Sequence, residues 1–219
     1  MRIDIRGPII PNNYKEVYDF FGMESTAPSD IRKAVEKASG EQLDIYIDSG
    51  GGEIHAGSNI YTDLRSYKGP VNIYVVGLAA SSASVIAMAG KLQMSPTAMM
   101  MVHNVATMTG GDYREMDKAS AILKEANKSI AAAYVSKSGM TEKEALTMMD
   151  EETWITAQRA VELKLADGVM FDEQQPMVAD YNSGLLSVSM INEIKAKIQN
   201  KSNIDLEQQK INLLNLRRI

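Results

Sequence analysis

Alternating apolar and polar positions mark the strands of this chain, and apolar positions spaced by three and four mark its helices. The alternation and the short apolar runs predict strands at residues 2–6, 43–47, 71–76, 92, 99–102, 154–156 and 169–171. The helical spacing predicts helices at residues 29–39, 54–67, 79–89, 113–136, 141–149 and 157–164. A strand, a turn and a helix follow one another twice before residue 90, which is typical of parallel strands joined by right-handed crossovers. The pattern therefore predicts an α/β core.

The longest predicted helix, residues 113–136, has an apolar seam like that of a coiled coil. The members of this seam are Met116, Ala119, Leu123, Ala126, Ile130 and Ala133. Such a seam packs either on its own domain or on a partner helix, and the pattern alone leaves both open.

The composition of the chain changes after Phe171. The stretch DEQQPMVADYNSG holds turn formers and few large apolar residues, which is typical of a linker. Beyond it, residues 185–200 and 205–219 have the spacing of amphipathic helices. We therefore expect one domain at residues 1–172, followed by a linker and a C-terminal helical extension at residues 173–219.

Composition and charge limit the kinds of active site and binding partner that the chain can have. Cysteine is absent, which excludes disulfides, thiolate nucleophiles and cysteine-bound zinc. The two histidines offer little for a histidine metal site, so we expect neither a metal nor a cofactor. The net charge of −5 gives no reason to expect nucleic acid or an anionic membrane as a partner. The sequence shows no secretion signal and needs no membrane span, so we expect a cytoplasmic location.

Three candidate groups each follow a predicted strand. Ser81 lies where a strand is expected to turn into a helix, the glycine-rich turn 48–52 ends a second strand, and His103 ends a third. Because parallel strands end at one edge of a sheet, we expect these groups to meet there. Together they supply a nucleophile, a base and oxyanion donors. Taken singly, such a serine is commonly a helix cap, and a lone histidine is commonly structural.

Four motifs, in this order, resemble the Clp protease proteolytic-subunit family (ClpP). SGGGEIHAGSNIYTDL is similar to its glycine turn and following helix, GLAASSASVIAMAG to its nucleophile segment, and SPTAMMMVHN to its catalytic-histidine strand. The fourth motif is ETWITAQRAVELKLADGV. The resemblance extends from about residue 2 to residue 171 and implies a ClpP/crotonase-like spiral of βαβ units with a projecting long helix.

This resemblance implies the roles of four residues. Ser81 would be the nucleophile and His103 the general base. The oxyanion donors would be the backbone N–H groups of Gly52 and Ser82, because the interval from Gly52 to Ser81 aligns without a gap. The proline that the family has in the glycine turn is Gly50 here.

The acid of the triad is where this sequence departs from the family. The family has an aspartate two residues before an aromatic residue, and here the aromatic is Trp154 and the matching residue is Glu152. A glutamate can orient an imidazole as an aspartate does. We favour Glu152, with Asp150 as the alternative.

The resemblance implies an endopeptidase that acts on polypeptides inside a homo-oligomer of stacked rings, where the long helix meets its counterpart. Two other readings stay open: a crotonase-like acyl-CoA enzyme of the same architecture, and a scaffold without activity. Among peptidases, an extension of about 45 residues together with Gly50 and Glu152 resembles the head-maturation proteases of tailed bacteriophages, which trim capsid or scaffold proteins. The alternative is a Clp subunit that serves an ATP-driven unfoldase.

Overall fold

The computed structural model describes residues 1–172, 192 and 195. The chain divides into two units, Met1–Asp172 and Glu173–Ile219, and the fold described here is that of the first. The expected linker and the helices expected at 185–200 and 205–219 lie outside the described residues, apart from Asn192 and Lys195.

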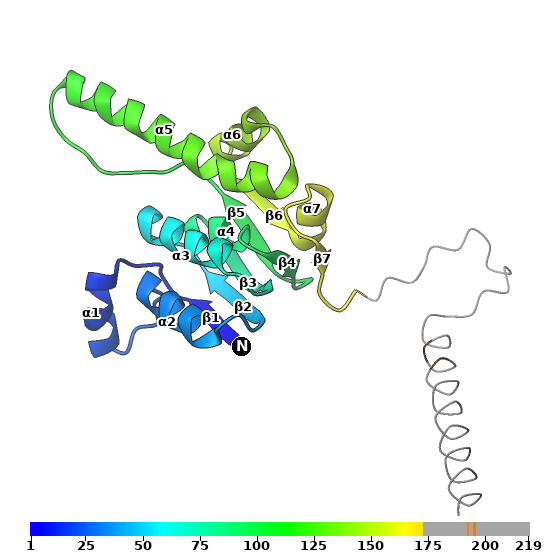
Figure 1. The fold of residues 1–219 in the computed structure, drawn as a ribbon. Coiled ribbons are helices and arrows are strands. Elements are labelled where there is room, and N and C mark those ends of the chain that lie inside the picture. The colour runs from blue at the N-terminus through cyan, green and yellow to red at the C-terminus, as the bar shows by residue number, and fades with distance from the viewer. Residues whose placement is uncertain (173–191, 193–194, 196–219) are drawn as a thin grey trace, which may run out of the picture. The chain divides into compact units, whose positions relative to one another are not determined.

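A seven-stranded sheet forms the centre of the first unit (Figure 1). Its strand order is β1-β2-β3-β4-β7, with β5 paired to β3 and β6 paired to β5. All pairings are parallel except that of β5 with β6, so the α/β prediction is confirmed. The strands are β1 (Arg2–Arg6), β2 (Leu43–Ser49), β3 (Val71–Ala80), β4 (Lys91–Met94), β5 (Met99–Val102), β6 (Thr153–Thr156) and β7 (Gly168–Val169).

Helices connect most of these strands and cover the sheet (Figure 1). The helix α3 packs against both α2 and α4, and all six residues of α4 are buried. The helical elements are η1 (Asn12–Tyr14), α1 (Lys15–Phe20), α2 (Pro28–Ala38), α3 (Ile54–Ser66), α4 (Ser82–Ala87), α5 (Tyr113–Ser138), α6 (Glu142–Asp150) and α7 (Ala157–Glu162). None of the helices in the described part of the chain is long and apolar enough to cross a membrane.

The boundary between β3 and α4 differs from the sequence prediction. The strand, expected to end at residue 76, continues to Ala80 because residues 78–80 pair with Met99–Met101 of β5. The helix expected from residue 79 accordingly starts at Ser82. Hydrogen bonding to a second strand therefore decides where the serine turn lies.

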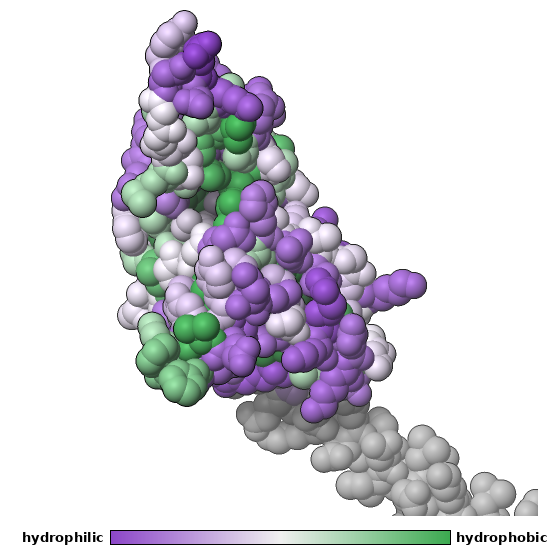
Figure 2. Space-filling model, turned by 90° about the vertical axis from the view of Figure 1, so that its left-hand side faces the viewer, coloured by the Kyte–Doolittle hydropathy of each residue, from purple (hydrophilic) through white to green (hydrophobic). Residues whose placement is uncertain are grey.

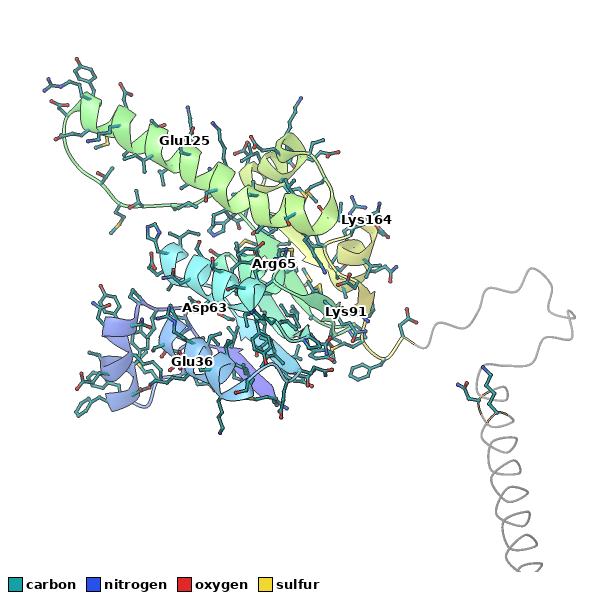
Figure 3. The ribbon with its side chains drawn as sticks, in the orientation of Figure 1. Glu36, Asp63, Arg65, Lys91, Glu125 and Lys164 are labelled. Atoms are coloured by element: carbon teal, nitrogen blue, oxygen red, sulfur yellow. The ribbon has the colours of Figure 1, made fainter. Side chains whose placement is uncertain are left out.

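The long helix α5 is anchored only at its C-terminal end. Ile130, Ala131, Ala133 and Tyr134 are buried in the core, whereas residues 113–118 are exposed. Figure 1 shows this half running away from the sheet. Glu125, labelled on α5 in Figure 3, forms an ion pair with Lys128 at 2.7 Å. The predicted seam is thus divided: its end packs on its own domain, and Met116, Ala119, Leu123 and Ala126 remain at least partly exposed.

Candidate active site

Ser81 occupies a sharp turn between β3 and α4. Its backbone has φ 55° and ψ −127°, a positive-φ conformation that side-chain-bearing residues rarely adopt. Such strain costs on the order of 1–3 kcal/mol and persists only where the surroundings hold it. Here the Ser81 N–H donates to the carbonyl of Met101 at 3.0 Å, which ties the turn to β5.

His103 follows β5 directly and faces this serine. Because β5 pairs in parallel with the end of β3, in register Ala80 with Met101, both strands deliver their next residues to the same edge of the sheet. The Nε2 atom of His103 lies 2.8 Å from the Oγ atom of Ser81, a hydrogen bond that joins residues 22 positions apart. The structure thus brings together the two residues that the sequence predicts as nucleophile and base.

The glycine turn after β2 packs against the serine turn. A Cβ atom at Gly51 would lie 2.5 Å from the carbonyl oxygen of Ala80 and 2.8 Å from the Cβ atom of Ser81, so no larger residue fits without a shift. The segment around Ile9 holds the turn from the other side: the Ile9 N–H donates to the Gly51 carbonyl, and its own carbonyl accepts from the Glu53 N–H, both at 2.9 Å. The turn is therefore fixed in place.

The two predicted oxyanion donors line the same cavity as Ser81 and His103. Gly52 follows Gly51, and Ser82 is the first residue of α4. Neither backbone N–H donates a hydrogen bond to any residue in the described part of the chain. The N–H of Gly52, in the glycine turn, and the N–H of Ser82, in the first turn of α4, are therefore both available to a negatively charged oxygen.

The cavity has a volume of about 670 Å³ and runs from the serine turn toward α5. Its walls are largely apolar, and Figure 2 shows apolar side chains gathered below the projecting end of the helix. Leu123 and Ile130 contribute from α5, and Met108, 99% exposed, lies at the rim in the loop before it. Walls of this kind favour the binding of apolar groups.

Neither candidate acid is hydrogen-bonded to His103 within the described residues. Asp150 instead accepts from the Nδ2 atom of Asn104 at 2.8 Å, beside the histidine. Glu152 is exposed and has φ 48°, and its N–H donates to the Met149 carbonyl at 3.2 Å. The described part of the chain therefore contains a serine-histidine pair with two carboxylates nearby, and no carboxylate in it completes a triad.

Sequence reasoning missed two polar residues of this region. Asn104 holds Asp150, and its buried Oδ1 atom has no hydrogen-bond partner among the described residues. It directly follows His103 and could have been noticed. Tyr134 lines the cavity and bonds to Ser84 across 50 residues, a pairing that no local pattern reveals.

Two other polar residues at the cavity have clear positions. Glu53 caps α3 by accepting from the N–H groups of His55 and Ala56, as expected of a carboxylate at a helix start. His55 is exposed and lines the cavity rim.

Comparison with known proteins shows the family to which the chain belongs. The Clp protease family matches residues 32–173, a span that includes both strand ends and both turns of the site. This chain belongs to the Clp protease family. It is therefore a serine-type peptidase by family, and the acyl-CoA alternative loses its support.

Relatives in the Clp protease family come from several bacteria. The chain is 27% identical over 137 residues to ATP-dependent Clp protease proteolytic subunit 1 of Chlamydia abortus, which covers 60% of this chain and 71% of that protein. It is 28% identical over 134 residues to the ATP-dependent Clp protease proteolytic subunit of Bacteroides fragilis, covering 60% and 65%. The fold is similar to that of a ClpP1 point mutant from Listeria monocytogenes, with a TM-score of 0.64 and 19% identity over 77% of this chain and 90% of that one. The predicted ClpP-like fold is thus confirmed.

Proposed function

We propose that this chain is a serine endopeptidase in which Ser81 is the nucleophile and His103 the general base. The observation that carries the proposal is the 2.8 Å contact between the Oγ atom of Ser81 and the Nε2 atom of His103. The contact connects a serine in a strained turn with an imidazole nitrogen that can accept its proton. A helix cap has no need of a histidine partner.

The chemistry follows from this contact. With the imidazole neutral and protonated on Nδ1, Nε2 accepts the hydroxyl proton while Oγ attacks the carbonyl carbon of the substrate. The carbonyl oxygen becomes negatively charged and receives hydrogen bonds from the N–H groups of Gly52 and Ser82. The imidazolium then gives its proton to the leaving amine. A water molecule, activated by the same histidine, hydrolyses the acyl-enzyme and restores Ser81.

An acid from the segment 150–152 stabilises the imidazolium in this scheme. Resemblance to the family supports Glu152. The hydrogen bond with Asn104 supports Asp150, because it holds this carboxylate beside the residue that follows His103. A movement of this exposed segment is needed before either carboxylate bonds to Nδ1 of His103.

Replacing Ser81 with Ala tests the assignment. We expect loss of peptide hydrolysis with an unchanged unfolding temperature, because Ala keeps the backbone and removes only the hydroxyl. A fluorophosphonate should label the wild-type protein at Ser81. Labelling at Ser82 or Ser84, or retained hydrolysis in the Ser81→Ala variant, contradicts the proposal.

For the biological role we propose maturation of a bacteriophage head, by trimming of capsid or scaffold proteins inside an oligomeric ring. The departures at Gly50 and Glu152 support it. The second candidate, a subunit working with an unfoldase in the cytoplasm, is supported by the names of the bacterial relatives. Cleavage of a full-length unfolded polypeptide without any ATPase would favour the first role, and a requirement for an ATP-driven unfoldase would favour the second.

A further inference from the structure

Three polar groups form a buried chain behind the serine turn. The hydroxyl of Tyr134, on α5, lies 2.8 Å from the Oγ atom of Ser84, which in turn donates to the carbonyl oxygen of Ser81 at 2.7 Å. Tyr134 is 2% exposed and Ser84 is fully buried. The proposed chemistry uses neither residue.

The direction of these bonds follows from counting protons. A carbonyl oxygen only accepts, so the single hydroxyl proton of Ser84 is committed to Ser81. The contact between Tyr134 and Ser84 therefore requires the phenol to donate. Burial raises the pKa of Tyr134 to about 12, so the phenol keeps its proton near neutral pH.

The peptide at the end of this chain also contains an oxyanion donor. The Ser81 carbonyl and the Ser82 N–H belong to one peptide group, which is trans and planar, so the two point in opposite directions. The carbonyl accepts from the hydroxyl of Ser84 and also from its N–H at 3.0 Å. These hydrogen bonds hold the Ser81 carbonyl toward the core. The Ser82 N–H, on the opposite side of the peptide, therefore points away from the core. Hydrogen bonds in series also polarise the groups that they connect.

We propose that Tyr134 and Ser84 are positioning residues for the oxyanion hole, acting through the Ser81–Ser82 peptide. The inference rests on the proposed function, because it assigns the Ser82 N–H to the developing oxyanion. It differs from a purely structural role: two hydroxyls that only satisfy each other in the core stabilise the fold, whereas this pair strengthens binding of the transition state.

The hydrogen-bonded chain from Tyr134 through Ser84 to the Ser81 carbonyl is called the relay below. The variant Tyr134→Phe tests it, since this change keeps the ring and removes only the hydroxyl. We expect kcat for a short fluorogenic peptide to fall about 3- to 10-fold, the effect of one hydrogen bond, with KM unchanged. The affinity for a peptide boronate, whose tetrahedral adduct places an oxygen in the oxyanion hole, should fall by the same factor. Tyr67→Phe is the matched control, because it also removes a hydrogen-bonded phenol hydroxyl, whose partners are the backbone of Gly40 and Glu41, and Tyr67 does not line the cavity.

Ser84→Ala provides a second variant that breaks the relay at its other bond. It should lower kcat to a similar degree, and adding Tyr134→Phe to it should cause no further loss, because the phenol then has no path to Ser81. Unchanged kcat and boronate affinity in both single variants, with only a lower unfolding temperature, would overturn the relay and leave the proposed function intact. A wild-type protein that neither cleaves peptide nor forms the boronate adduct at Ser81 would overturn both.

Discussion

At the scale of single residues, the serine turn is held by contacts from three directions. Its N–H bonds to β5, its carbonyl bonds to Ser84, and Gly51 packs against its Cβ atom. A strained conformation needs this support, since a residue left alone relaxes to negative φ. The strain therefore serves to present the Oγ atom to His103 in a fixed direction.

The contacts at the site do not decide whether Glu152 or Asp150 is the acid of the proposed triad. If Glu152 orients His103, Glu152→Gln should lower kcat by roughly 100- to 10,000-fold with little change in KM, because an amide cannot stabilise the imidazolium. Asp150→Asn should then cost far less, since a more distant carboxylate acts only through screened interactions. Steady-state kinetics on a short peptide measures both.

The reverse ranking would assign the acid to Asp150 and would give its bond with Asn104 a catalytic purpose. Asn104→Ala is the companion variant: it should weaken an Asp150-dependent enzyme and leave a Glu152-dependent one nearly unchanged. Small effects from both carboxylates would mean that the serine and histidine work as a pair.

The residues at the site were predictable to different degrees. Ser81 and His103 each follow a strand in a motif of small or apolar residues, so position and motif together predict the pair that the 2.8 Å contact joins. Tyr134 was not predictable, because its partner lies in an element that only tertiary packing brings near. The acid was ambiguous because three carboxylates follow one another in an exposed segment, and sequence spacing does not fix backbone position there.

At the scale of elements, α5 has an exposed half with apolar residues. Met116 is 37% exposed and lies outside the cavity, whereas Leu123, in the same seam, also lines the cavity wall. Met116→Glu is therefore the cleaner probe of helix–helix contact: it should weaken self-association, since burying an unpaired charge costs several kcal/mol. Sedimentation velocity measures this effect.

Lys118→Gln is the matched control for that variant. It changes the net charge by the same amount, and it lies about 200° around the helix from Met116 at about 100° per residue. Self-association that both variants weaken equally would point to a general charge effect, and a Met116→Glu protein that assembles like wild type would exclude the seam as an interface.

Element boundaries show where sequence patterns stop being informative. The apolar spacing identified α5 and α6 well, because periodicity is a local property of the sequence. It placed the end of β3 four residues too early, since small residues such as those at 77–80 fit strand and helix alike and only pairing with β5 decides between them.

At the scale of the whole molecule, the proposed function requires an assembly. In the unit Met1–Asp172 the cavity opens below the projecting half of α5, and we expect neighbouring subunits of a ring to close it. We therefore expect light scattering at micromolar concentration to give a mass several times the 24.0 kDa of one chain. A fully active species of 24.0 kDa would contradict a ring-forming peptidase.

The exposed position of Met108 has a consequence for the protein under oxidative stress. The chain contains 15 methionines and no cysteine, so thioethers are its only sulfur groups. Met94 and Met100 are fully buried, whereas Met108 is 99% exposed at the cavity rim. Peroxide converts an accessible thioether into a polar sulfoxide. Among the methionines that the structure describes, we therefore expect Met108 to oxidise first, which would make the cavity rim more polar while the core is still intact.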